Sequence, residues 1–287
     1  MSILRAFQQG LATTRRRSRL ILYLWLANLF FGVLVLGPFI YLAGRDFGSS
    51  LEGDRLLQGV DFIWLGDVIL NQGDALAGLA GWALIPFSLY LVWSIFSSGG
   101  ILGRIAAEEE KTTLAAFVSD GCQYFFRFFR VPLIAIPVYV IVFGLLYKLL
   151  NLPLAAWSRT AGGPWGDFWA STLGVLVFLA LFSLVRILFD YARIRLVVDR
   201  SRKAFRAVVM TFGFLGGRLV PAWALYLLIA AVSVVVLALF LLVSRLLTGA
   251  SGAMVLVVWL QVLAAVRQGI RILFLASESH YYKGSQL

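Results

Sequence analysis

The chain has 287 residues, of which 61% are hydrophobic and 14% are charged, and its formal net charge at pH 7 is +11. Soluble domains carry about 25% charged residues, so this composition excludes an ordinary soluble globular protein. The single cysteine, Cys122, excludes an internal disulfide and a CxxC metal or redox pair. We therefore predict an integral membrane protein.

Six mainly apolar segments are long enough to cross a hydrocarbon core about 30 Å thick. Backbone groups inside a bilayer must bond within their own segment, so we expect each span to be a helix. The predicted fold class is all-α: a polytopic membrane helix bundle that forms a single transmembrane domain over residues 1–287. The predicted spans are residues 20–43, 76–98, 131–150, 168–189, 219–244 and 252–274.

The distribution of basic residues predicts how the chain is oriented. Of the 25 Lys and Arg residues, 20 fall in the segments that lie on the same side as both termini. Because loops rich in Lys and Arg stay in the cytoplasm, we place the N and C termini there. The first span then acts as an uncleaved signal anchor, and the protein is a multi-pass protein of the bacterial cytoplasmic (inner) membrane.

Two longer connections are predicted on the outer side. The first, residues 44–75, carries apolar residues at helical spacing that would suit a short surface helix, but we favour a solvated cap over the helix ends. The second, residues 151–169, holds Trp157, Trp165 and Trp169 and is typical of an interfacial turn with aromatic anchors.

On the cytoplasmic side, two amphipathic elbow helices are predicted, one before span three and one before span five. Thr112 and Ser201 are their expected N-caps. Each elbow is followed by a proline, Pro132 or Pro221, at the start of the next span. The apolar face of the first elbow comprises Leu114, Phe117, Val118, Gly121, Phe125 and Phe128, and that of the second comprises Phe205, Val208, Val209, Phe212 and Leu215.

The densest polar group is Arg186, Asp190 and Arg193, whose spacing of i, i+4 and i+7 puts all three on one helix face. They would form a charge network at the mouth of a cavity, or they would be ordinary ion pairs where span four continues past the membrane, which is the interpretation we favour. The candidate contacts for lipid headgroups or a partner are Arg186, Asp190, Arg193, Arg202, Arg206, Arg267 and Arg271.

The expected partners of these basic residues are anionic lipid headgroups on the cytoplasmic face, at about 1 kcal/mol for each basic residue near the surface. A partner protein in a membrane complex is the alternative, and nucleic acid is not expected, because the topology already requires cationic loops here.

The sequence gives little support for catalysis. No Asp, Glu, Lys or His lies at mid-span, which argues against a proton-coupled carrier. His280 lies beside Glu278 and Ser279, but three adjacent residues cannot converge as a folded triad does, and we expect an exposed tail. No P-loop, HExxH or GxSxG pattern is present. We expect no catalytic residues, metal ligands or cofactors.

Three segments carry a resemblance to known families: Ser119–Asp120–Gly121 with the aromatic run 124–128, then residues 190–198, then Ala276–Ser277–Glu278. On these residues the chain resembles a poorly characterised family of bacterial six-helix integral membrane proteins. A looser likeness extends to the glycerophosphoryl diester phosphodiesterase membrane domain, where catalysis belongs to a separate soluble domain. Neither resemblance implies a reaction for this chain.

A third likeness concerns the first elbow. Ala115–Ala116, Asp120–Gly121 and Val131–Pro132 look somewhat like the coupling loop of ABC importer permeases, although Leu114 stands where that pattern has Glu. The leading hypothesis is a non-enzymatic membrane protein that binds lipid or a partner, as a scaffold or as a subunit of a membrane complex. The alternative is a transporter or ABC-type permease subunit.

Overall fold

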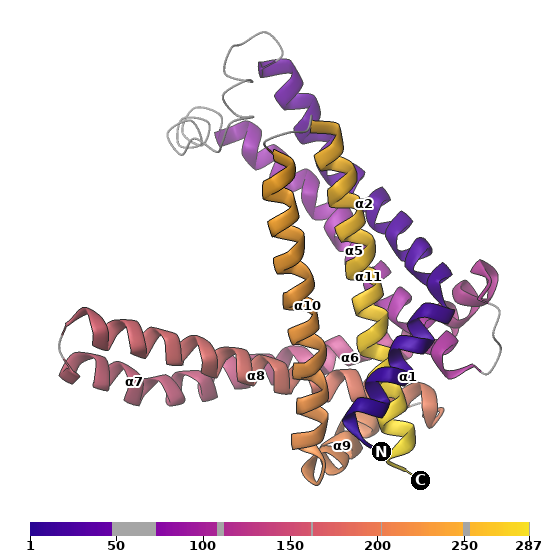
Figure 1. Ribbon diagram of the computed structural model, residues 1–287, viewed down its shortest axis with the longest axis vertical. Coiled ribbons are helices and arrows are strands. Elements are labelled where there is room, and N and C mark those ends of the chain that lie inside the picture. The colour runs from indigo at the N-terminus through magenta and orange to yellow at the C-terminus, as the bar shows by residue number, and fades with distance from the viewer. Residues whose placement is uncertain (48–72, 108–111, 162, 202, 249–252, 287) are drawn as a thin grey trace. The chain divides into compact units, whose positions relative to one another are not determined.

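The computed structural model describes residues 1–47, 73–107, 112–161, 163–201, 203–248 and 253–286 (Figure 1). Every regular element in these ranges is a helix, which confirms the all-α class. Six helical stretches of the described chain are long and apolar enough to cross a membrane, which supports a multi-pass membrane protein. They are Ser18–Pro38, Gly81–Ala106, Leu114–Ser158, Pro164–Val198, Leu219–Leu247 and Val255–Gly284.

The chain divides into two compact units, Met1–Leu22 with Phe96–Leu287 (unit 1) and Tyr23–Ile95 (unit 2). The expectation of a single transmembrane domain stays a prediction. Unit 2 contains most of α2 (Ser18–Phe47) and the first part of α5 (Gly73–Ala106).

Within unit 2, the apolar faces of its two helices meet. The Trp82 indole donates a hydrogen bond to the Leu34 carbonyl at 3.3 Å, and the rings of Phe31 and Tyr90 meet edge to face with centroids 5.5 Å apart. The outer connection for which we favoured a solvated cap lies outside the described residues over its central part, 48–72.

Unit 1 begins with an amphipathic helix, α1 (Ile3–Arg16), that we did not predict from the sequence. The Ser2 hydroxyl caps it by accepting a hydrogen bond from the Arg5 backbone N–H at 3.4 Å. Its buried residues, Ala6, Gly10 and Thr14, are small and recur every four positions. Because they are small, α1 lies against the end of α11 (Ala253–Gly284), where a Cβ on Gly10 would be 2.8 Å from the Ser277 backbone.

The first predicted elbow is not a separate helix. α6 (Leu114–Ile141) runs through Pro132 into span three, then continues as a π-helix, η1 (Val142–Leu146), and as α7 (Tyr147–Ala161). Membrane helices tolerate proline because neighbouring groups satisfy the freed carbonyl. The predicted cap is wrong by one residue, since the Thr113 hydroxyl and not that of Thr112 accepts from the Ala116 N–H, at 3.2 Å.

The second outer connection is also mostly helical, so the predicted interfacial turn over 151–169 is wrong. α7 continues to Ala161, and α8 (Pro164–Val198) begins three residues later. The chain reverses at Gly163, whose φ of +94° lies in the left-handed region that glycine adopts without a steric penalty. A turn therefore needs far fewer residues here than the sequence pattern indicated.

The second elbow is a separate helix, α9 (Ala204–Gly216), followed by α10 (Leu219–Thr248). The expected N-cap at Ser201 is wrong: Lys203 occupies the cap position, and its side chain makes no capping bond. The predicted apolar face is only half buried. Val208 and Leu215 are buried with the small residues Ala204, Ala207 and Thr211, whereas Phe205, Val209 and Phe212 are exposed.

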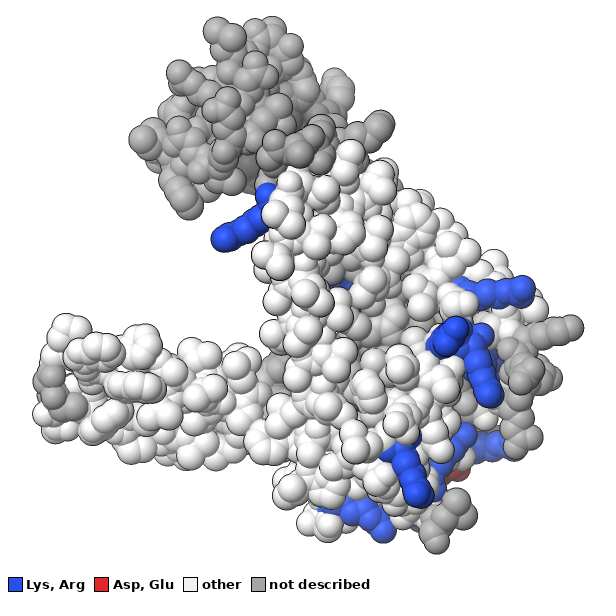
Figure 2. All heavy atoms as spheres, in the orientation of Figure 1, with Lys and Arg blue, Asp and Glu red and all other residues white. Residues whose placement is uncertain are grey.

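The core of unit 1 lies where the end of α11 packs against α1, α8 and α10, and we call this region the terminal end. Ala276, Ser277 and Glu278 are each 0% exposed, so the expected exposed tail is wrong. The tail is instead the last part of a continuous helix that α1 covers. Lys and Arg side chains gather over the part of the molecule that holds α1 and both termini, whereas the α7–α8 hairpin shows none on the visible face (Figure 2).

Arg17 fixes the junction between α1 and α2. It is only 8% exposed, and its Nη2 donates a hydrogen bond to the Ala107 carbonyl at 2.9 Å, just after the last turn of α5. Burial lowers the pKa of the Arg17 guanidinium, the positive charge of Arg104 lowers it further, and the negative charge of Asp120 opposes both. Arg17 is therefore a structural residue as well as a basic residue that precedes the first span.

Candidate functional site

The structure brings the three predicted residues of α8 together at the terminal end. The Arg193 Nη1 donates a hydrogen bond to Asp190 Oδ1 at 2.9 Å, and the Arg186 Nε lies 3.6 Å from Asp190 Oδ2. Asp190 is 6% exposed. Its carboxylate is therefore shielded from solvent and holds two guanidinium groups on one face of the helix. We infer an orienting role for Asp190, because it is too buried to meet a ligand itself.

Arg186 is held on two further sides by aromatic rings. Its guanidinium carbon lies 5.7 Å from the ring centroid of Tyr226 on α10 and 5.5 Å from that of Phe274 on α11. Both distances are within the range of about 6 Å in which a ring attracts a cation. The Arg186 side chain is nonetheless 46% exposed. This guanidinium is thus oriented by the protein and still accessible.

Glu278 on α11 adds a second carboxyl group to the site. Neither of its carboxyl oxygens has a hydrogen-bond partner among the described residues, and the side chain is fully buried. The charges of Asp190, Arg186 and Arg193 all act on it. Burial of an ionisable group without a hydrogen bond is costly, so Glu278 is a candidate functional residue.

Sequence reasoning missed Glu278 because it was assigned to the tail. The signal was present, since Arg267, Arg271, Phe274 and Glu278 follow one another at steps of four, three and four. Extending span six by three turns with this helical period places Glu278 on the same stripe as Phe274.

Aromatic residues close the site from the side of α11. Tyr191, which is 0% exposed, has its ring centroid 6.4 Å from that of Tyr281 and 6.5 Å from that of Tyr282. The Tyr282 hydroxyl donates a hydrogen bond to Asp199 Oδ2 at 2.9 Å, and the same oxygen pairs with Arg195 Nε at 3.0 Å. These contacts fix the end of α8 against α11.

The other candidate residues do not join this site. The Arg271 Nη2 donates hydrogen bonds to the hydroxyls of Ser97 and Ser98, at 3.1 and 2.9 Å, so it links α11 to the end of α5. Arg206 is exposed on α9, and Arg267 is exposed on α11. Arg202 lies outside the described residues.

His280 points away from the acidic pair. Its Nε2 and the Thr13 hydroxyl on α1 are 2.8 Å apart, whereas the charges that act on Glu278 are those of Asp190, Arg186 and Arg193 on α8. Two positions along a helix are about 200° apart around its axis, so these side chains cannot converge. In the described part of the chain, no group of three His, Cys, Asp or Glu residues could hold a metal ion.

Asp120, the acidic residue of the first elbow, is paired within the protein. The Arg104 Nε and Asp120 Oδ2 form an ion pair at 2.5 Å, with side chains 9% and 14% exposed. Gly121 provides the room for the Phe96 ring, which a Cβ at this position would meet. Asp120 and Gly121, two of the residues that carry the likeness to a coupling loop, therefore face α5, whereas Ala115 is exposed.

Comparisons with protein-family models, with curated proteins and with solved structures found no match for this chain.

Proposed function

We propose that the chain is a non-enzymatic multi-pass protein of the bacterial cytoplasmic membrane that binds an anionic lipid headgroup at Arg186, as a scaffold or as a subunit of a membrane complex. This proposal rests on the environment of the Arg186 guanidinium. Two rings and a carboxylate orient it, while nearly half of the side chain stays exposed.

Arginine suits this role because its planar group of N–H donors matches a phosphate in two parallel hydrogen bonds. The distance of 3.6 Å to Asp190 is longer than a normal hydrogen bond of about 2.7–3.2 Å, so the ion pair does not saturate the guanidinium. Arg193, whose side chain is 29% exposed, lies two turns further along the same face and supplies a second positive charge.

The charge pattern around the site also favours an anionic ligand. No Asp or Glu occurs between Asp199 and Glu278, although this stretch contains eight Lys and Arg residues. The acidic residues of the site itself are shielded, so the surface next to it is dominated by positive charge. An anionic headgroup gains about 1 kcal/mol from each nearby basic residue.

The proposal is tested by lipid binding to the purified full chain in mild detergent, with native mass spectrometry to count bound phosphatidylglycerol and phosphatidylcholine. We expect Arg186→Gln to weaken phosphatidylglycerol binding about fivefold, as the loss of about 1 kcal/mol implies. The matched control is Arg206→Gln, which removes an exposed arginine from α9 and should have less effect.

Equal losses in both variants would show that binding depends on overall charge and would refute the Arg186 site. Purification of the unsubstituted chain in mild detergent, with identification of the proteins that purify with it, tests the alternative function. A stoichiometric ATPase in the purified material would replace the scaffold proposal with an ABC-type permease subunit.

A further inference from the structure

A row of exposed apolar side chains runs along α9. Phe205, Val209 and Phe212 are 68%, 52% and 57% exposed. With 3.6 residues in each helical turn, the three lie within about 60° of one another around the axis, and we call them the α9 stripe. Contact with water is unfavourable for apolar surface, so a contiguous row of this kind is typical of a contact with a protein or a membrane.

The α9 stripe lies between two other sectors of the helix surface. The residues that pack on the protein, among them Val208 and Leu215, lie on one side of it. On the other side lie the exposed residues Arg206 and Met210, at about 100° and 140° from Phe205. An exposed apolar sector beside a sector that carries Lys or Arg is typical of a helix in a membrane interface.

α9 is connected directly to helices that are apolar enough to cross a membrane. The candidate span in α8 ends at Val198, five residues before the helix begins, and that in α10 begins at Leu219. Leu219 is only three residues beyond Gly216, the last residue of α9, and three residues of extended chain reach at most about 11 Å. The C-terminal end of α9 is therefore held at the surface of the bilayer.

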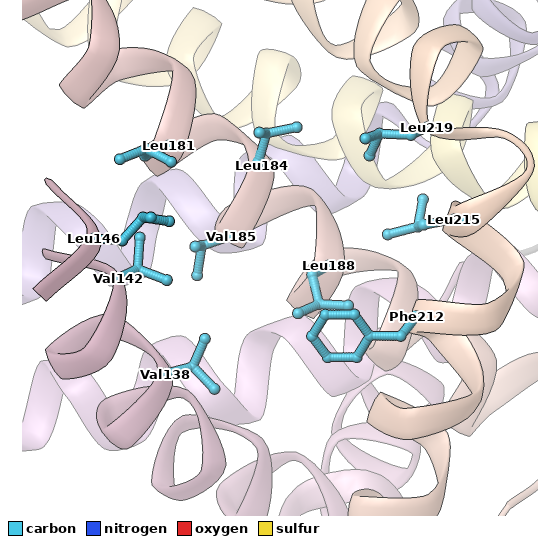
Figure 3. A pocket seen from close by; sticks show the side chains of 11 residues that line it. Val138, Val142, Leu146, Leu181, Leu184, Val185, Leu188, Phe212, Leu215 and Leu219 are labelled. Carbon is cyan, nitrogen blue, oxygen red and sulfur yellow. The ribbon is translucent and has the colours of Figure 1, made fainter. Parts of the chain in front are cut away.

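The α9 stripe faces the apolar part of the neighbouring spans. Phe212 lines an apolar cavity together with Leu184 of α8 and Val138 of α6, which both lie in candidate spans (Figure 3). Arg195 lies about three turns beyond Leu184 along α8, and its Nη1 donates a hydrogen bond to the Met210 carbonyl at 3.0 Å. The stripe is thus on the side of the hydrocarbon core, whereas Met210 is on the side of the charged end of α8.

We propose that α9 lies in the surface of the bilayer, with Phe205, Val209 and Phe212 among the acyl chains next to the headgroups. Lipid covers the stripe because the stripe continues the apolar surface of the spans, and the end of the helix is held at that surface. Interfacial helices bury their apolar face about 5–10 Å into the boundary between headgroups and acyl chains. The second elbow is thus a membrane contact and not a docking helix for a soluble partner.

The test measures the depth of nitroxide labels attached to single cysteines. Cys122 is exposed and is first replaced by serine, which removes the one native cysteine of the chain. Phe205→Cys then labels the α9 stripe. Met210→Cys is the matched control, because Met210 is exposed on the same helix about 140° away. Val209→Cys repeats the measurement on the stripe and covers the case that Phe205→Cys fails to fold.

The labelled full chain is reconstituted in bilayers of phosphatidylcholine and phosphatidylglycerol. Electron paramagnetic resonance then measures collisions of each label with oxygen, which concentrates among acyl chains, and with a water-soluble nickel chelate. We expect the labels at positions 205 and 209 to lie about 5–10 Å below the headgroup boundary, and the label at position 210 to lie on its water side. Predominant collision with the nickel chelate at both stripe positions would overturn the membrane contact.

Protection of both stripe positions from both reagents would also overturn the proposal, because a protein surface would then cover the stripe. Spin–spin broadening that disappears on dilution with unlabelled chains would identify that surface as a second copy. The measurement does not depend on the Arg186 site, since Arg186→Gln should leave the depth of all three labels unchanged.

Discussion

The contact between Gly10 on α1 and Ser277 on α11 gives the most direct test of the packing at the terminal end. In Gly10→Ala the added methyl would lie 2.8 Å from the N and Cα of Ser277, which are backbone atoms and cannot rotate away. Restoring a distance of about 3.5 Å requires the helices to separate by about 0.7 Å, which forfeits about a quarter to a half of the van der Waals attraction at the contact.

The expected cost follows from two opposing effects. Overpacking typically costs about 1–3 kcal/mol, and a clash with backbone puts this substitution near the upper limit. Alanine stabilises a helix interior by about 1 kcal/mol relative to glycine. We therefore expect α1 to be bound to α11 about 2 kcal/mol less tightly, which raises the detached population about thirtyfold.

Limited proteolysis with trypsin in detergent measures that population, because α1 carries the exposed arginines Arg5, Arg15 and Arg16. When opening is fast relative to cleavage, the rate follows the open fraction. The control is Gly32→Ala on α2, where a Cβ meets nothing within 4 Å and only the helix preference changes. Cleavage of Gly10→Ala at the same rate as Gly32→Ala would refute the close α1–α11 contact.

Three further substitutions are measured by thermal unfolding in detergent. Asp190→Asn should lower the free energy of unfolding by about 2 kcal/mol, because Asp190 accepts a hydrogen bond from Arg193 at 2.9 Å and hydrogen bonds to charged groups contribute about 1.5–3 kcal/mol. An unchanged midpoint of thermal unfolding would show that the carboxylate does not stabilise the fold. Tyr282→Phe should cost about 1 kcal/mol through the lost bond to Asp199, and no change would mean that water replaces it. Gly163→Ala should lower the free energy of unfolding by about 1–2 kcal/mol, because alanine is strained at a φ of +94° even though its Cβ would have open space. The control is Gly144→Ala in η1, which should not lower the free energy of unfolding.

The spans were predictable because a hydrocarbon core fixes both the length and the composition of a helix that crosses it. Five of the six predicted segments lie wholly in helices that are long and apolar enough to cross a membrane, and the sixth, 252–274, does so from residue 253 onward. Their ends were not predictable to the same degree. Apolar composition stops at the membrane, whereas the helix stops only where the chain reverses, as α7 does at Gly163.

Only part of the charge network around Asp190 could be predicted from the sequence. The spacing of Arg186, Asp190 and Arg193 correctly indicated a shared face, because that is a local property of one helix. The rings of Tyr226 and Phe274 come from two other helices, and no local period relates them to Arg186. Glu278 was missed because a polar residue after an apolar run is typical of an exposed end, whereas here α11 packs against α1, α8 and α10 and buries it.

The stripe of small residues on α1 can be found in the sequence, but the sequence allows two interpretations of this segment. Ala6, Gly10 and Thr14 recur every four residues, yet an arginine-rich segment before a first span is equally typical of an unstructured orientation signal. Only the position of Ser277 shows that this stripe has a partner.

Arg17 has a practical consequence for experiments that determine topology by charge inversion. Among the five arginines that precede the first predicted span, Arg5, Arg15, Arg16 and Arg19 are exposed, and replacing any of them with glutamate changes the translocation signal without removing a packed side chain. Inverting Arg17 would also place an acidic group beside the Ala107 carbonyl that its guanidinium now bonds. A scan that treats all five alike would confuse misinsertion with misfolding, and Arg17 should be left unchanged.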